Sequence, residues 1–169
     1  MPIEPDSSMW ELIASTLEPV APPPEARHRL FEALEGAGRF LPFYAELGRY
    51  FDLSRDRVKD LLSKIDDPKV WTRGLEPIQG YLHFAPGPQL TGLHGGLIRM
   101  NKGAQFARHR HVDREVTFVL EGMLRDERGV RFGPGRAIEM APGSEHAVYV
   151  EGEGPTLIAL LNGTVDMLG

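Results

Sequence analysis

The sequence predicts a mainly β protein, a small antiparallel jelly-roll barrel with a helical region in front of it. Residues 69–169 contain short extended runs separated by turn sequences rich in glycine and proline. Residues 1–68 instead show apolar side chains at helical spacing. Because this spacing changes near residue 68, we expect two parts, a helical N-terminal region (1–68) and a barrel domain (69–169).

Four helices are expected in the N-terminal region. Ser8 and Glu11 form a capping box that opens the first helix. The proline-rich segment 18–25 cannot continue that helix, but Pro24 is well placed to open the second. Ser54 is the expected N-cap of the fourth. The apolar residues of the four helices fall within 9–17, 27–34, 43–51 and 58–65.

Residues 44–65 resemble a DNA-binding helix-turn-helix in their order of helix, short turn and helix. The match is poor at the turn, where Asp52 stands in the place that usually takes glycine, and Asp56 and Asp60 interrupt the basic residues that follow. Residues 1–68 also hold 13 acidic and 8 basic side chains, which disfavours a nucleic-acid partner. We therefore expect these helices to pack on the barrel or on a partner protein, and we expect no nucleic acid to bind.

Eight extended runs follow residue 69, and turn sequences such as NKG, FGPG and APGS separate them. This number of short strands with this turn chemistry is typical of a jelly-roll barrel whose mouth holds one ligand or metal. The runs cover 78–84, 95–100, 104–111, 115–122, 123–129, 136–140, 146–150 and 156–162.

The segment 103–122 contains the strongest chemical signal in the chain. His109 and His111 are two residues apart, so on a strand their side chains lie on the same face. We expect a tight turn after them to start a second, antiparallel strand that brings Glu115 beside the two histidines. His146 must come from a later strand. Imidazole nitrogens and a carboxylate oxygen suit zinc, iron, manganese or nickel, so these four side chains predict a mononuclear site for a divalent metal.

The same residues resemble the first motif of the cupin superfamily, in which glycines frame two histidines and a glutamate at fixed spacing. The matching residues are Gly103, His109, His111, Glu115 and Gly122. The second cupin motif is matched by Gly135, Gly143 and His146, but its proline is one place late at Pro142 and its final asparagine is replaced by Val150. The resemblance implies a double-stranded β-helix barrel, and it also implies that the protein is a homodimer.

A narrower resemblance involves both parts of the chain. A proline-rich linker after an amphipathic helix, then a barrel with HRH, VLEG, DERG and APGSEH, is similar to the C-terminal region of ChrR-type zinc anti-sigma factors. This resemblance implies that one zinc ion is held by His109, His111, Glu115 and His146, and that a sigma factor is the partner. In that family the sigma factor is bound by an N-terminal zinc module with a CxxC pair. This chain has no cysteine and therefore lacks that module. Either the helical region substitutes for it, or the chain is a relative with a different partner, or it is a standalone cupin.

Two classes of function remain open. The one we favour is a transcription-regulatory sensor of the anti-sigma type, in which the metal supports sensing of a small ligand or oxidant and the helices pass the change to a partner. The alternative is a cupin metalloenzyme, a dioxygenase or isomerase, because three histidines and a glutamate leave room at the metal for a small-molecule substrate.

The sequence offers few further groups that an enzyme would need, and no catalytic residue is assigned. Tyr81, Gln105 and Thr117 are candidates for lining the pocket, and His83 lies on an expected strand that could face the barrel interior. Arg108 and Arg110 alternate with the ligand histidines, so their side chains are expected to point away from the metal.

The composition excludes several other classes of protein. With no cysteine, neither a disulfide framework nor a thiolate metal site can form. No segment has the pattern of a secretory signal or the length of a membrane span. We therefore expect a cytoplasmic protein that does not associate with membranes.

Overall fold

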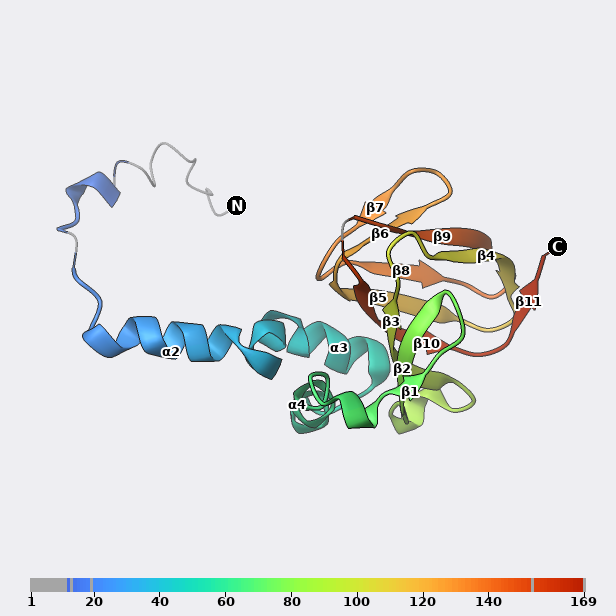
Figure 1. The fold of residues 1–169 in the computed structure, drawn as a ribbon, viewed down its shortest axis with the longest axis horizontal. Helices are drawn as coiled ribbons and strands as arrows, with labels where there is room; N and C mark the ends of the chain where they lie inside the picture. The colour runs from blue at the N-terminus through green and yellow to red at the C-terminus, as the bar shows by residue number, and fades with distance from the viewer. Residues whose placement is uncertain (1–11, 13, 19, 153, 169) are drawn as a thin grey trace, which may run out of the picture. The chain divides into compact units, whose positions relative to one another are not determined.

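The structure is a computed structural model that describes residues 12, 14–18, 20–152 and 154–168 (Figure 1). The chain divides into two compact units, 1–33 and 34–169. Two antiparallel sheets form most of the second unit, and helices precede them in the chain. The predicted fold class, mainly β with a helical N-terminal region, is confirmed.

The first unit contains helical residues 12 and 14–16 and then all but the last residue of helix α2 (Pro24–Leu34), which begins at the proline expected to open it. Proline is favoured at the start of a helix because the first backbone N–H groups have no partner within the helix. The capping box expected at Ser8 and Glu11 lies outside the described residues.

Helices at the start of the second unit correspond to the two expected near residues 43–65. Asp52, at the end of the first of them, adopts the left-handed conformation (φ 52°) that glycine usually takes there, and the Ser54 hydroxyl caps the next by accepting a hydrogen bond from the backbone N–H of Arg57. The helical elements of this unit are η1 (Gly36–Phe43), α3 (Tyr44–Phe51), α4 (Arg55–Ser63), η2 (Pro68–Val70) and η3 (Pro88–Leu90).

The strands form two sheets. The six-stranded sheet has the order β1-β2-β3-β10-β5-β8 and the five-stranded sheet the order β11-β4-β9-β6-β7. The first contains β1 (Thr72–Arg73), β2 (Ile78–Phe84), β3 (His94–Met100), β10 (Thr156–Asn162), β5 (Glu115–Glu121) and β8 (Ala137–Met140). The second contains β11 (Val165–Met167), β4 (Gln105–His111), β9 (Glu145–Glu151), β6 (Met123–Asp126) and β7 (Arg131–Phe132).

Two apolar cores lie on the opposite faces of the six-stranded sheet. On one face, strand residues such as Phe118, Leu97 and Leu161 pack with buried residues of η1, α3 and α4. On the other face, residues such as Val119 and Ile158 pack against the five-stranded sheet. The six-stranded sheet is therefore covered on both sides, whereas the five-stranded sheet has only its inner face in a core.

Polar contacts also attach the helices of the second unit to the sheet. The Tyr50 hydroxyl donates a hydrogen bond to the Glu139 carboxylate of β8, 3.0 Å away. The Arg39 guanidinium pairs with Asp66, after α4, and with Glu121 at the end of β5. We expected α3 and α4 to pack on the barrel or on a partner protein, and in the structure they pack on the barrel. Among the described residues, no helix is both long enough and apolar enough to cross a membrane.

Candidate metal centre

Strand β4 brings His109 and His111 to the interior, and its neighbour β9 adds His146. His109 and His146 are register partners in this antiparallel pair, so their rings lie side by side. All three imidazoles are buried, with at most 7% of the residue surface exposed. A register shift between Phe106 and His109 interrupts the ladder just before the histidines.

Glu115 approaches the histidines from the opposite sheet, which differs from the expected hairpin. β4 belongs to the five-stranded sheet and β5 to the six-stranded sheet, and the two strands do not pair. The connection between them is held by the segment before β11, because Val112 donates its backbone N–H to Thr164 and the Asp113 carboxylate accepts the N–H of Thr164. The turn after His111 therefore takes the chain from one sheet to the other, and the prediction that β5 pairs with β4 is wrong.

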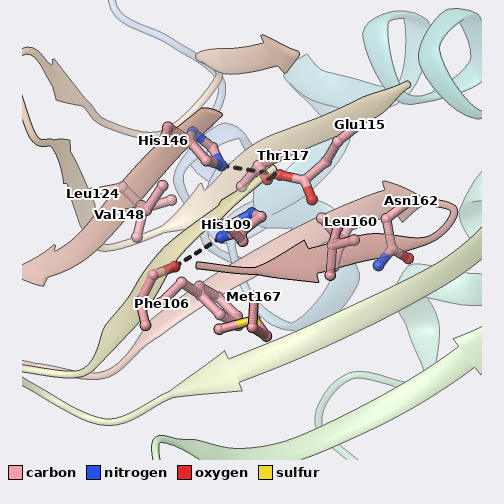
Figure 2. A pocket seen from close by; sticks show the side chains of 12 residues that line it. Phe106, His109, Glu115, Thr117, Leu124, His146, Val148, Leu160, Asn162 and Met167 are labelled. Atoms are coloured by element: carbon pink, nitrogen blue, oxygen red, sulfur yellow. Dashed lines mark hydrogen bonds and ion pairs between the residues drawn. The ribbon is translucent and has the colours of Figure 1, made fainter. Parts of the chain in front are cut away.

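The four expected ligand side chains nevertheless meet in one place. Their potential ligand atoms all lie within 4.8 Å of one another. The Glu115 carboxylate lies 3.6 Å from Nδ1 of His111 and 3.6 Å from Nε2 of His146, and Figure 2 shows the Glu115 and His146 side chains directed toward each other. The three rings are 4.7 to 4.9 Å apart between centroids and are steeply inclined to one another. Three imidazoles and one carboxylate are a donor set for a divalent transition metal.

The hydrogen bonding of the three histidines leaves ring nitrogens free for a metal. Nδ1 of His109 lies 2.8 Å from the carbonyl oxygen of Ala107, which leaves Nε2 of that ring for a metal. Both ring nitrogens of His111 and of His146 are buried and have no hydrogen-bond partner among the described residues. Buried polar atoms are nearly always paired, so a group of unpaired nitrogens beside a carboxylate fits a site for a cation.

Electrostatics favours neutral imidazole at His111. Burial lowers the pKa of His111 below its usual value, and the carboxylate of Glu115 only partly opposes this effect. A neutral imidazole has a free nitrogen lone pair, which is what a metal ion binds. The Glu115 carboxylate is oriented by Thr117, whose hydroxyl donates a hydrogen bond of 3.2 Å to it.

A cavity of about 200 Å³ lies beside the cluster. Three of the four expected ligands face it, while His111 is not part of its wall. The other lining residues are Phe106, Ala107, Thr117, Leu124, Val148, Leu160, Asn162, Val165 and Met167. Of the pocket residues considered from the sequence, Thr117 is part of this wall, whereas Tyr81 and Gln105 are not.

His83 does not face the barrel interior. Its side chain is exposed and borders a groove lined by residues of α4 and β2, so the expectation that it faces the interior is wrong. Arg108 and Arg110 lie outside the site, as expected. Both guanidinium groups pair with Glu145, and their hydrogen bonds, above all that from Arg110, lower the pKa of that carboxyl.

Comparison with known proteins supports the assignment of the fold. Residues 87–165 match the sequence model of the family described as the ChrR cupin-like domain. No curated protein matches the chain.

Solved structures with a similar fold include the complex of Rhodobacter sphaeroides SigE with the anti-sigma ChrR (TM-score 0.51, 19% identity, covering 92% of this chain and 75% of that chain). An acetylacetone dioxygenase from Acinetobacter johnsonii is similar over 61% of this chain and 74% of its own, with 12% identity and a TM-score of 0.50. A cupin-like protein of unknown function from Ralstonia eutropha is matched over only 56% of its length, with 17% identity and a TM-score of 0.46.

The complex with ChrR and the dioxygenase share the fold, and the family match covers the strands that carry all four clustered side chains. The barrel of this chain therefore has a cupin fold, and over residues 87–165 its sequence is similar to the ChrR cupin-like domain.

Proposed function

We propose that the barrel binds one divalent metal ion through His109, His111, Glu115 and His146, and that this ion is zinc. The support is the cluster itself, four buried donors within 4.8 Å with unpaired imidazole nitrogens. Zinc is commonly held by four nitrogen and oxygen donors in a tetrahedron. The bound ion would supply a positive charge and a link between the two sheets, because the histidines and the glutamate come from different sheets.

We further propose that the domain is a regulatory module and that its metal site communicates with the helices of the second unit. The observation that carries this proposal is the position of β5. Glu115 and Thr117 on this strand face the metal site, while Val116, Phe118 and Leu120 belong to the core beneath η1, α3 and α4. A structural change at the metal site can therefore reach the helices through β5 alone.

A sigma factor is the partner we propose. The fold of the chain resembles that of the SigE–ChrR complex over 92% of its length. Helix α2 presents Leu30, Phe31 and Leu34, whose surfaces are 58%, 51% and 54% exposed. Residues at this spacing lie along one face of a helix, and an exposed apolar face of this kind is a common docking surface for a protein. We propose that this face takes the role of the cysteine-containing module, which the chain lacks.

Metal analysis tests the first proposal. The full chain, purified without chelators, is expected to contain one zinc ion per chain, and no oxygen uptake is expected with small carbonyl and enediol compounds. Bound iron together with oxygen consumption would contradict the regulatory assignment.

A bacterial two-hybrid assay against each sigma factor of the host tests the partner. One positive pair is expected, and Leu30→Asp should abolish it. Leu75→Asp is the matched control, since Leu75 is 88% exposed and lies in the other unit. The sigma-factor proposal would be refuted if no sigma factor gave a positive signal, or if Leu30→Asp and Leu75→Asp reduced the signal equally.

A cupin metalloenzyme is the second candidate function, and one observation favours it. Three of the four proposed ligands border a cavity large enough for a small substrate. Against it, among the described residues none that lines the cavity is ionisable apart from the proposed ligands. General acid–base catalysis needs a titratable group near the reacting atoms, so the regulatory function has the stronger support.

A further inference from the structure

The cavity beside the metal cluster has one polar end and otherwise apolar walls. His109, Glu115 and His146 border the polar end, and Figure 2 shows Phe106, Leu124, Val148 and Leu160 around the remaining space. Met167, which is 65% exposed, forms part of the wall where the cavity meets solvent. A molecule that fills this space would therefore contact the polar cluster with one end only.

The charges of the wall limit which molecules can enter. In the part of the chain that the structure describes, Glu115 is the only acidic residue that lines the cavity, and no lysine or arginine lines it. Without a metal ion, the carboxylate would repel an anion. With a divalent cation in the proposed site, one negative charge from Glu115 leaves a net charge of one positive unit. A bound cation is the largest local charge in such a site, so a single negative charge on a ligand would be balanced there and a second would not.

Polar side chains beyond the proposed ligands are found only near the cluster. Thr117 already donates its hydroxyl to Glu115. Asn162 lies two residues after Leu160, whose register partner on β5 is Thr117, so the amide is near the level of Glu115. Within the described residues, this amide has no hydrogen-bond partner. It is therefore available to donate a hydrogen bond to an oxygen atom of a ligand at the polar end.

The volume limits the size of the molecule. The cavity measures about 200 Å³, and an apolar cavity of about 150 Å³ is sufficient to hold benzene. The space therefore fits a body the size of one six-membered ring together with a small head group.

Resting on the proposed metal site, we propose that the ligand of this pocket is a monoanionic organic acid with a compact apolar body. Its oxygen anion lies at the end bordered by His109, Glu115 and His146, within reach of the Asn162 amide. Its body lies against Phe106, Leu124, Val148 and Leu160. Sugars and dicarboxylates are excluded, because the apolar walls offer no partner to a hydroxyl or to a second charge.

Calorimetric titration of the zinc-loaded full chain tests this ligand class. The probes are acetate, butyrate, hexanoate, benzoate and succinate. Affinity should rise at least about tenfold from acetate to hexanoate or benzoate, because each buried methylene contributes favourably. Succinate should bind more weakly than butyrate, and the metal-free chain should bind none of the acids. Equal affinities along the series, or succinate binding as well as butyrate, would overturn the proposal.

Two variants locate the binding in this cavity. Leu160→Phe should fill part of the space and weaken benzoate at least about fivefold more than acetate. Leu75→Phe makes the same substitution at an exposed position outside the cavity and should leave both affinities unchanged. The titrations of the unmodified chain decide the question even if Leu160→Phe does not fold.

Metal content measured in the same samples separates the two proposals. Retained zinc with a flat affinity series contradicts the ligand class alone. A chain that retains no divalent metal contradicts the proposed site and, with it, this inference.

Discussion

Thr117 and Phe118 are neighbours on β5, but their side chains lie on opposite faces of the same sheet. The Thr117 hydroxyl contacts the Glu115 carboxylate at the candidate metal centre. The Phe118 ring packs against the rings of Phe43 and Tyr50, with centroids 5.7 and 6.1 Å away. Because successive side chains of a strand alternate between faces, a single strand belongs to both the metal pocket and the helical layer.

The proposed ligands predict a graded response to substitution. His109→Ala or His146→Ala should reduce metal content from one ion per chain to well below half, and should lower thermal stability, because part of the free energy of metal binding stabilises the fold. Glu115→Gln removes the anionic donor but keeps an oxygen, so a smaller loss is expected. Metal content is measured after dialysis against metal-free buffer. His83→Ala, at an exposed histidine outside the site, should keep full occupancy, and unchanged content in both alanine variants would refute the ligand set.

The shared strand face of His109 and His111 could be predicted because their spacing is local, whereas His146, on a distant strand, was included through the resemblance to the second cupin motif. His109 and His111 share a strand face wherever that strand lies, and the glycines at either end of the segment match a known motif. The change from helix to strand near residue 68 is also visible in the spacing of apolar residues. These features depend on residues close together in the chain, which sequence patterns describe well.

The pairing of β5 could not be predicted in the same way. Alternation in β4 suggested a simple hairpin, but the run from Val116 to Leu120 is apolar at four of its five positions and is buried throughout. Such a run is typical of a central strand covered on both faces, and its partners, β10 and β8, come from distant parts of the chain. The sequence pattern did not predict that Asn162 and Met167 line the pocket, for a related reason. Apolar and polar residues do not alternate clearly in β10 or in the short β11, so the sequence does not indicate which of their side chains face the barrel interior.

Gly122 ends β5 in a conformation that a larger residue would disturb. Its φ is 83°, and a Cβ atom there would clash with the hydroxyl oxygen of the buried Thr156. Gly122→Ala should therefore destabilise the protein through both backbone strain and a clash. Gly129→Ala is the control, because its φ is 86° but a Cβ atom would meet nothing within 4 Å. Because the backbone strain is common to both variants, the difference reflects the clash, and urea unfolding should show a free energy of unfolding at least about 1 kcal/mol lower for Gly122→Ala than for Gly129→Ala. Equal losses of stability would show that the clash is relieved without cost.

The ion pair between Arg39 and Asp66 predicts an effect of acid on stability. The hydrogen bond from Arg39 holds the pKa of Asp66 below its ordinary value of 3.8. A carboxyl group with a lowered pKa in the folded state contributes stability above its ordinary pKa, and loses that contribution as the pH falls through the lowered value. Asp66→Asn should therefore cost stability at pH 7, and the difference from the unmodified protein should shrink toward pH 3 and below.

The size of this effect is limited because the Asp66 side chain is 54% exposed. We expect a loss of less than about 1 kcal/mol at pH 7, measured by urea unfolding. Asp60→Asn is the control, since it breaks an exposed pair with Lys64 within a single helical segment, and its effect should be smaller. A difference for Asp66→Asn that stays constant between pH 7 and strongly acidic pH would contradict the assigned ion pair.

Thr117 is expected to support the metal site without binding the metal. Thr117→Val preserves the shape of the side chain but removes the hydrogen bond to Glu115. Groups that orient metal ligands typically change affinity by about 10- to 100-fold, and we expect about tenfold weaker zinc binding in competition with a chromophoric chelator. Thr156→Val is the matched control on β10, because its hydroxyl is also buried but contacts the N–H of Met123 instead. Equal effects of both substitutions would assign the loss to general destabilisation.

Coupling between the helices and the metal site can be tested at Phe118. Phe118→Leu removes the aromatic contacts with Phe43 and Tyr50 from the strand that contains Glu115. Phe84→Leu is the matched variant, because Phe84 on β2 packs its ring on Phe51 of α3 at a centroid distance of 5.4 Å but shares no strand with a proposed ligand. Both variants should lose stability. If β5 connects the two layers, only Phe118→Leu should also weaken zinc binding, by severalfold.

The reciprocal measurement follows from linkage, since the effect of the helices on metal affinity must equal the effect of metal on the helices. Zinc should slow amide hydrogen exchange in α3 and η1 of the unmodified chain, and this protection should be reduced in Phe118→Leu but retained in Phe84→Leu. The contrary outcome is that the two variants change zinc affinity equally and that zinc slows amide exchange only in β4, β9 and β5. The metal would then stabilise the barrel without affecting the helices. The regulatory proposal would then lose its structural basis, while the metal site would stand.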